Sequence, residues 1–400
     1  MISWEKALQL IFLNIKPLPA VKVDITRAVG MILAEDVYSK IQMPPFNKSA
    51  MDGYAVKFTD LVKTPVKLKC AGIIQAGCSF EKKIKPGQCV KIMTGAPVPS
   101  DVDCVVMIED TRQLKSGYVE ILKGGKQGEN ICVRGEDIRA GQKVLSRGTL
   151  LFASHVSLLA SVGRCFVKVI RKPRVAVLNT GSEIIPAGGK LGKNKLYNSN
   201  GPQLQALLNI DNIESCFLGI AKDEPKAMKA AVKKGIRYDM LLISGGVSMG
   251  DYDLVPEILE KSGVKKIFHK VKIKPGKPVF FGTKNNTAVF GVPGNPVSNF
   301  TAYHLLIRPA IHKMLGYTDC NPKLYEGIVT RQINKKTGRK HFIPITISSK
   351  AGRYYMTPLS GHGSADIFTL SKSDGFMIVE EDVKNVATNS IKSFITWKKI

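Results

Sequence analysis

The sequence has few acidic residues and lacks the short motifs that identify the commonest nucleotide and metal sites. Its 400 residues include 59 Lys and Arg against 32 Asp and Glu, which gives a formal net charge of +27. GxxxxGK[ST], a GxGxxG after the first strand of the central region and HExxH are all absent. Their absence argues against a Walker-type nucleotide site, an ordinary dinucleotide fold and a zinc-protease helix. The eight cysteines include no CxxC pair, so a zinc ribbon or thioredoxin-like motif has no support.

Long apolar runs are also missing. No stretch of about 20 apolar residues occurs, and Glu5 and Lys6 precede only a short, interrupted apolar run. We therefore expect no membrane span, no signal peptide and a cytoplasmic location. In that reducing compartment the cysteines are expected to be buried free thiols.

The excess of positive charge indicates anionic partners, of which nucleic acid and anionic small molecules are the two candidates. Most of the lysines are explained by a solvated surface. The sequence contains no basic motif interleaved with aromatic residues. We therefore expect no nucleic-acid partner.

Strands and helices alternate through the central region, residues 174–316. A repeated β-α-β order predicts a doubly wound, mostly parallel sheet with helices on both faces. Ligands of such sheets bind at the carboxyl ends of the strands. The expected elements are strand 175–178, helix 201–208, strand 213–220, helix 223–235, strand 240–244, helix 254–263, strands 270–273, 279–281 and 288–291, and a long helix over 295–315.

The flanking regions have other patterns. Helical spacing occurs at 3–15 and 150–164, and between them residues 43–137 contain short β-like runs separated by turn residues. Residues 317–400 are again β-like, which predicts a small barrel or sandwich.

One stretch of the central region has the clearest signal for chemistry. The strand 240–244 ends at Gly245 and Gly246, and Asp251 and Asp253 follow just before the next helix. Backbone N–H groups at a helix start suit an oxyanion, and the two carboxylates suit Mg²⁺. An ordinary turn with solvated acids remains the alternative.

Other loops at strand ends add to this inventory. Glu183 follows the first strand, while Lys274 and Lys277 flank a fixed Pro-Gly turn. Carboxylate-held Mg²⁺ beside lysines is typical of sites for phosphate chemistry.

Eight segments of the chain match, in order, the motifs of one family. They are Ser-Ala-Met-Asp-Gly-Tyr-Ala (49–55), Met-Thr-Gly-Ala-Pro-Val-Pro (93–99), Arg-Gly-Glu-Asp-Ile (134–138), Thr-Gly-Ser-Glu (180–183), Asn-Ser-Asn-Gly-Pro-Gln-Leu (198–204), Ser-Gly-Gly-Val-Ser-Met-Gly-Asp-Tyr-Asp (244–253), Lys-Pro-Gly-Lys-Pro (274–278) and Pro-Gly-Asn-Pro-Val-Ser (293–298). With these segments the chain resembles the molybdopterin molybdenumtransferases of the MoeA type, a family that also includes the gephyrin E domain.

The resemblance implies a multidomain α/β plus β subunit that forms a homodimer. The active site would lie between the α/β domain of one subunit and the β-rich arm of the other. Further partners would be a Mog-type adenylyltransferase and molybdoenzyme-maturation proteins. The implied parts are a discontinuous helical domain (1–42 and 138–170), a β-rich arm (43–137), a doubly wound Mog-like α/β domain (171–316) and a C-terminal β-barrel (317–400).

The reaction implied by the resemblance is insertion of molybdate into adenylylated molybdopterin, which releases AMP and forms molybdenum cofactor with the help of Mg²⁺. The implied catalytic residues are Asp52, Thr94, Asp137, Glu183 and Asp223. The implied metal ligands are Glu183, Asp251 and Asp253. The implied substrate and anion contacts are Gly245, Gly246, Ser248, Lys274, Lys277, Pro293, Ser298 and Ser364.

Three positions depart from the family pattern. Asn47-Lys48 stands where Asp-Asn is common, which puts a metal role at 47 in doubt. Asn299 replaces a usual Ala, and Pro344 replaces a common Arg, so an anion contact there is also in doubt.

Two other functions stay open at this point. The α/β region alone would suffice for a molybdopterin adenylyltransferase, although residues 1–170 would then be unexplained. A basic nucleic-acid-binding protein is the other alternative, suggested by the net charge of +27.

Overall fold

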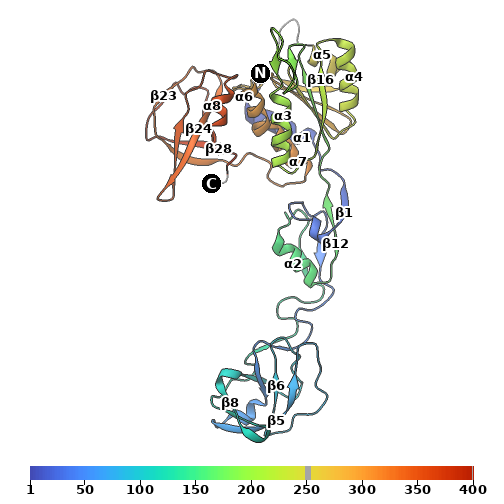
Figure 1. The fold of residues 1–400 in the computed structure, drawn as a ribbon, viewed down its shortest axis with the longest axis vertical. Coiled ribbons are helices and arrows are strands. Elements are labelled where there is room, and N and C mark those ends of the chain that lie inside the picture. Colours follow the sequence, from blue (N-terminus) through green and yellow to red (C-terminus); the bar gives the residue numbers. More distant parts are fainter. Residues whose placement is uncertain (248–253, 399) are drawn as a thin grey trace. The chain divides into compact units, whose positions relative to one another are not determined.

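The computed structural model describes residues 1–247, 254–398 and 400, and the chain divides into two compact units (Figure 1). Unit 1 consists of Met1–Val21 and Val169–Ile400, and unit 2 of Lys22–Lys168. The four domain boundaries predicted from the sequence stay predictions. Helix α1 (Trp4–Asn14), which they assign to a helical domain, belongs to unit 1.

A six-stranded sheet forms the centre of the α/β part of unit 1. Four neighbouring strands pair in parallel, and two further strands are added at one edge by antiparallel pairing. The sheet is therefore mostly parallel, as predicted. The order is β16 (Ser215–Ala221), β13 (Val175–Thr180), β17 (Met240–Ser244), β21 (Thr287–Val292), β20 (Phe280–Lys284) and β18 (Lys265–His269).

The apolar runs of this sheet are buried along their whole length. All residues of β13, β17 and β21 are buried, because helices cover both faces. On one face, α4 (Pro225–Gly235) and α5 (Val255–Lys261) bury Met228, Val232 and Leu259 in a cluster with strand residues. Helix α3 (Asn200–Ile210) contacts β13, β16 and the last helix of this part.

The predicted long helix begins and ends close to the expected residues but changes its hydrogen bonding in the middle. It consists of α6 (Pro296–Ala302), a π-helical segment (Tyr303–Ile307) and α7 (Arg308–Met314). Pro309 has no N–H to donate to the carbonyl of residue 305, and its ring would crowd that carbonyl in an α-helix. The wider turn relieves this crowding.

The predicted strand over 270–273 is wrong. The edge strand β18 ends at His269, and Lys270 has a positive φ of 77°, which interrupts an extended chain. The chain then enters β19 (Ile273–Lys274), which pairs with the C-terminal part.

The C-terminal part of unit 1 is a closed five-stranded barrel, as the sequence predicts. Within the ring, each of the five strands pairs with two others. The sixth strand of this sheet, β19, pairs only with β24. The ring runs β24 (Lys340–Lys350), β25 (Arg353–Pro358), β22 (Tyr325–Val329), β28 (Ile391–Thr396), β26 (Gly375–Val379) and back to β24. Smaller elements of unit 1 are β14 (Ile184–Ile185), β15 (Leu196–Tyr197), β23 (Ile333–Asn334), α8 (Ile367–Ser371) and β27 (Asn385–Val386).

Helix α1 joins the barrel to the α/β part. The indole N–H of Trp4 donates to the carbonyl of Leu305 at 3.1 Å, and its ring meets the ring of Phe342 edge-on at 5.3 Å. Because Leu305 lies in the π-helical segment and Phe342 in β24, one buried side chain contacts both parts.

Unit 2 is built on the β-rich sheet that the sequence predicts. Its core contains Val56, Leu68, Cys89, Val106 and Ile121. The sheet order is β7 (Cys104–Met107), β4 (Gly53–Val56), β6 (Gln88–Ile92), β5 (Val66–Ile74), β9 (Tyr118–Ile121) and β8 (Thr111–Gln113). The remaining strands form the pairs β1 (Ala20–Asp24) with β12 (Phe166–Ile170), β2 (Val37–Tyr38) with β11 (Lys143–Leu145) and β3 (Lys48–Ser49) with β10 (Ile131–Cys132), and α2 spans Ala153–Ser161.

Two further expectations concern thiols and membranes. All eight cysteines are free, but Cys78, Cys165 and Cys216 are exposed, so burial is wrong for these three. Within the described parts of the chain, none of the helices combines the length and apolar character needed to cross a bilayer.

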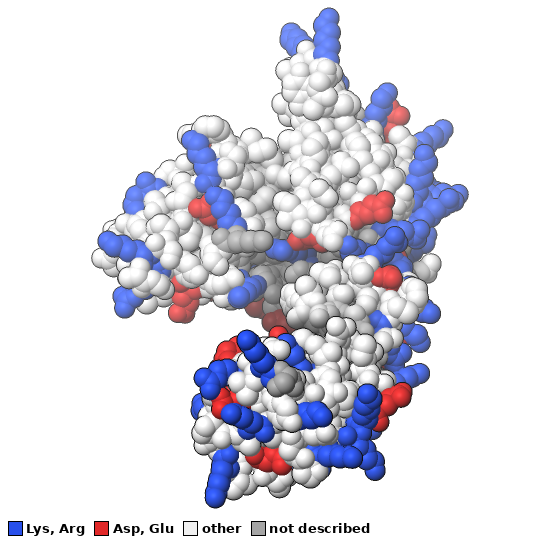
Figure 2. Space-filling model, turned by 60° about the horizontal axis from the view of Figure 1, so that its bottom comes forward, with Lys and Arg blue, Asp and Glu red and all other residues white. Residues whose placement is uncertain are grey.

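Positive charge is spread over the surface. On the face shown in Figure 2, Lys and Arg side chains occur in many places, with fewer acidic side chains between them.

Gly53 in β4 provides a test of the unit 2 sheet. A Cβ at this position would lie 1.9 Å from the carbonyl oxygen of Val106 on β7. Because backbone must move, Gly53→Ala is expected to destabilise unit 2 by roughly 3 kcal/mol. Gly124→Ala is the matched control, since its Cβ would meet Leu61 O at an ordinary 3.4 Å. Circular dichroism during urea denaturation measures both; equal stabilities would contradict the packing described.

Candidate active site

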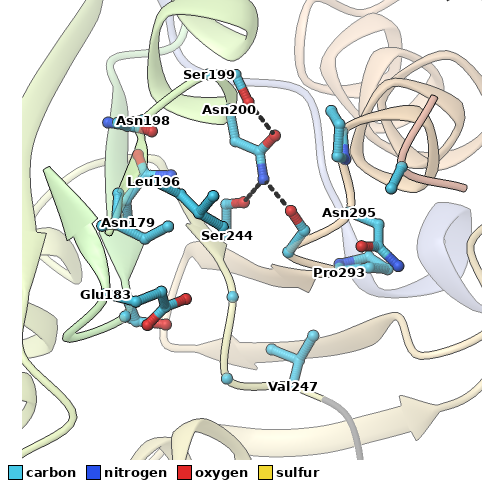
Figure 3. Close-up of a pocket in the computed structure, with 18 of the residues that line it drawn as sticks. Asn179, Glu183, Leu196, Asn198, Ser199, Asn200, Ser244, Val247, Pro293 and Asn295 are labelled. Carbon is cyan, nitrogen blue, oxygen red and sulfur yellow. Dashed lines mark hydrogen bonds between the residues drawn. The ribbon is translucent and has the colours of Figure 1, made fainter. Parts of the chain in front are cut away.

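A cavity of about 760 Å³ opens at the carboxyl ends of β13, β17 and β21 (Figure 3). Its wall is formed by the residues that end these strands and by the loops that follow them, including Thr180, Ser244 and Pro293. This is the edge of the sheet where the β-α-β order predicts a ligand.

Gly245 and Gly246 allow β17 to end tightly against β13. Both have positive φ, 100° and 65°. A Cβ on Gly245 would lie 2.6 Å from Thr180 O, and one on Gly246 would lie 2.8 Å from a methyl group of Val255. Only glycine fits both constraints, so the backbone after β17 faces the cavity without side chains.

A buried hydrogen-bond network fixes the end of β17. Ser244 Oγ accepts from Asn200 Nδ2 at 2.9 Å and from Asn299 Nδ2 at 2.8 Å. Asn200 Nδ2 also donates to the carbonyl of Gly294 at 2.7 Å (Figure 3). Helices α3 and α6, the strand end and the loop after β21 are therefore joined at one point.

This network explains one departure from the family pattern. Asn299 is fully buried, and its amide reaches Ser244 on the cavity wall. The usual Ala could not make this bond. Sequence reasoning did not find the pairing, because 55 residues separate the two groups.

Glu183 and Asp223 are exposed carboxylates on the first cavity. Asp223 Oδ2 accepts from Ser182 N at 2.8 Å, and Ser182 Oγ accepts from Asp223 N at 3.1 Å, so the two loops hold each other. Glu183 lies on the wall of this cavity, and its carboxylate forms no hydrogen bond or ion pair with another described residue (Figure 3). These hard oxygen donors fit Mg²⁺ chemically.

The described residues alone do not complete a metal site. Within 1–247, 254–398 and 400, no group of three or more His, Cys, Asp or Glu side chains is placed to hold an ion. The predicted ligands Asp251 and Asp253, and the predicted contact Ser248, lie outside the described residues.

A second cavity of about 680 Å³ adjoins the first and shares Pro278, Pro293 and Asn295 with it. The predicted anion contacts Lys274, Lys277, Ser298 and Ser364 all line this second cavity. Glu183, Asp223, Gly245 and Gly246 line the first, and Pro293 lines both. The structure thus divides the predicted residues of unit 1 between two neighbouring spaces.

Asn295, which sequence reasoning did not single out, lies at the junction of the two cavities. Its Nδ2 donates to Ser364 Oγ at 3.0 Å, and Val297 N donates to the carbonyl of Ser364 at 3.1 Å. These bonds attach the barrel loop 361–364 to the start of α6. Its place in the Pro-Gly-Asn-Pro segment is the signal that could have identified it.

Asp52, Thr94 and Asp137 lie in unit 2 and are not among the described residues that line either cavity. Asp52 Oδ1 accepts from Thr94 N at 2.7 Å and from Thr94 Oγ1 at 3.0 Å. The two donors hold the pKa of the exposed Asp52 below its ordinary value. Asp137 is exposed, and its N–H donates to the carbonyl of Met43.

Asn47, which departs from the family pattern, has a structural role in unit 2. Its Oδ1 accepts from Arg134 N at 2.8 Å, which fixes the loop before Asp137. Because an amide oxygen accepts this bond as a carboxylate oxygen would, the bond does not require Asp at position 47.

Comparison with known proteins identifies the class first. The α/β part that bears the first cavity, residues 176–313, matches the profile of a probable molybdopterin binding domain. Residues 2–163 match the MoeA N-terminal region (domain I and II), and residues 326–395 match the MoeA C-terminal region (domain IV). The three matches lie in the order that the sequence motifs predict.

Whole-chain relatives then identify the family. A molybdopterin molybdenumtransferase of Staphylococcus epidermidis is 33% identical over 339 residues, 84% of this chain and 81% of that protein. One of Haemophilus influenzae is 34% identical over 367 residues, 91% and 90% of the two chains. The crystal structure of a MoeA protein of Pyrococcus horikoshii superposes with a TM-score of 0.84 at 31% identity, over 100% of both chains. The chain belongs to the molybdopterin molybdenumtransferase family, and the predicted resemblance and fold class are confirmed.

The asparagine network yields a paired prediction. Asn200→Ala removes three hydrogen bonds, the two that Nδ2 donates and the one that Oδ1 accepts from Ser199 Oγ at 3.5 Å, and is expected to cost about 1–3 kcal/mol of stability. Asn299→Ala removes one bond together with Asn299 Oδ1, a buried acceptor without a partner among the described residues, so we expect a loss of about 1 kcal/mol or less.

Tryptophan fluorescence during urea denaturation reports both variants, because the two tryptophans, Trp4 and Trp397, lie in unit 1. A larger loss for Asn299→Ala than for Asn200→Ala would contradict the network.

Proposed function

We propose that this chain inserts molybdate into adenylylated molybdopterin, releasing AMP and forming molybdenum cofactor. The observation that carries the proposal is the pair of adjoining cavities, which share Pro278, Pro293 and Asn295. One is large enough for an organic substrate, and the other presents lysines to a small oxyanion. Family membership supports the same reaction.

The first cavity would hold the adenylylated pterin. The side-chain-free backbone at Gly245 and Gly246 allows close approach of a phosphate, and oriented backbone amides suit its oxygens. The asparagine network fixes this backbone, so the site needs little rearrangement to bind.

The second cavity would hold molybdate. Lys274 and Lys277 supply charge from a Pro-fixed turn, and Ser298 and Ser364 supply hydroxyl groups. Because the cavities adjoin at Pro293 and Asn295, the oxyanion and the pterin would lie next to each other. Lysine charge offsets the negative charge that develops as AMP departs.

Mg²⁺ would be held by Glu183, with Asp223 on the same wall, and by Asp251 and Asp253, which follow Gly245 and Gly246 in the sequence. When bound, the ion would neutralise phosphate oxygens and polarise the phosphoanhydride. Glu183 holds its carboxylate toward the cavity, and Ser182 fixes the loop through Asp223.

Asp52, Thr94 and Asp137 would be supplied by the second subunit of a homodimer. Thr94 supports such a role, because its two donors keep Asp52 ionised. A Mog-type adenylyltransferase would deliver the substrate, and molybdoenzyme-maturation proteins would accept the product in the cytoplasm.

The proposal predicts AMP release that depends on molybdate. Purified protein is incubated with adenylylated molybdopterin and Mg²⁺, and AMP is quantified as molybdate is varied. Equal release without molybdate would contradict insertion. Transfer of AMP from ATP to molybdopterin would indicate the adenylyltransferase alternative.

Asp52→Ala is expected to abolish turnover while leaving the dimer intact. Activity and the mass in solution, measured by light scattering, are compared with the parent. A monomeric variant would assign Asp52 a structural role instead.

Thr94→Val is expected to move the acid limb of activity to higher pH. The substitution removes one donor to Asp52, so the pKa of that carboxyl rises toward its ordinary value and protonation begins at higher pH. Thr111→Val is the control, since its hydroxyl donates to the carbonyl of Ile108. An unchanged pH profile for Thr94→Val would contradict a need for ionised Asp52.

A further inference from the structure

The second cavity has more cationic side chains than the two lysines assigned above. Lys335 and Arg339 also line it, from the segment between β23 and β24 of the barrel. Within the described parts of the chain, no ion pair involves Lys274, Lys277, Lys335 or Arg339. Four cations therefore surround one space without a paired carboxylate, although like charges repel.

Three carboxylates near this group are engaged elsewhere, and a fourth, Asp382, acts on Lys335 by its charge without forming an ion pair with it. Asp366, on the cavity wall, accepts from Thr369 N, Thr369 Oγ1 and His362 N, which lowers its pKa to about 2. The carboxylate of Glu380 pairs with Lys340 at 3.1 Å, and that of Glu381 with Lys272 at 4.0 Å.

His341 adds no charge to the wall. Burial, together with Lys274, Lys335 and Arg339, lowers the pKa of His341 to about 4, so the ring is neutral at physiological pH. Its Nδ1 is buried and has no hydrogen-bond partner in the described parts of the chain. The wall thus has unpaired cations and an unsatisfied ring nitrogen.

Arg339 is held beside the lysine turn. Its Nη1 donates to the carbonyl of Ile273 at 3.4 Å, directly before Lys274. Lys335 is anchored at the other end of the segment 335–339, where its Nζ donates to the carbonyls of Glu380 at 2.6 Å and Arg339 at 3.4 Å. The segment 335–339 therefore contributes both cations to the cavity that Lys274 also lines.

Pro344 lies in this wall, at the position where the family commonly has Arg. It pairs with Phe376 inside the barrel sheet and carries neither charge nor N–H. We propose that Arg339, supported by Lys335, provides the barrel's cationic contact to the bound oxyanion in this chain, in place of the residue at 344. The inference rests on the proposed function and adds to it the residues that set oxyanion affinity.

The test is equilibrium binding of molybdate alone to the full chain, by isothermal titration calorimetry. Arg339→Gln removes the charge but keeps an amide donor near Ile273 O. We expect the Kd to rise about 10- to 100-fold, as for the loss of a charge-assisted hydrogen bond. Lys336→Ala is the matched control: Lys336 is an exposed neighbour in the same segment, 335–339, and is not among the residues that line the cavity. Its Kd is expected to stay within about twofold.

A rescue variant excludes a merely structural effect. Pro344→Arg in the Arg339→Gln background returns a guanidinium to the same wall and is expected to recover at least tenfold of the lost affinity. Urea denaturation confirms that each variant is folded. Parental affinity in Arg339→Gln, or loss of affinity without rescue, would overturn the inference.

The same titration separates this inference from the proposed function. If Lys274→Ala abolishes binding while Arg339→Gln does not change it, the molybdate site stands and the role of Arg339 fails. If neither substitution changes binding, the oxyanion does not occupy the second cavity, and both proposals about this cavity fail.

Discussion

The site depends on the hydrogen bonds that converge on Ser244 Oγ. Through them, Asn200 of α3 and Asn299 of α6 fix the end of β17, and Asn200 also holds Gly294. All three side chains are buried, so their amide and hydroxyl groups have no water to replace a lost partner. The positions of the glycine turn and of the loop after β21 follow from this constraint. Both cavities are built on that loop.

The two cavities differ in the charged groups that line them. The first combines carboxylates with open backbone, which suits a phosphate-bearing substrate with a metal ion. The second combines cations from the α/β part and the barrel that form no ion pair with a described residue. An oxyanion would relieve the repulsion among these cations, so anion binding to this cavity would be favourable before any reaction takes place.

Much of this could be predicted from the sequence. Apolar runs such as 240–244 predict buried strands, and the β-α-β order predicts the edge where the cavity lies. The apolar pattern predicts a strand over 270–273 that does not form, because the left-handed conformation of Lys270 interrupts the extended chain. The hydrogen bonds to Ser244, and the hydrogen bond from Arg339 to the carbonyl of Ile273, join residues far apart in sequence. They depend on helix packing and barrel closure, which local periodicity does not encode.

The central claim is that a small oxyanion binds in the second cavity, beside the space for the pterin. A crystal of the full chain soaked in molybdate, with diffraction recorded at the molybdenum absorption edge, tests it most directly. We predict an anomalous peak in the second cavity, within contact of Lys274, Lys277 and Arg339. A peak elsewhere in unit 1, with none in this cavity, would contradict the account.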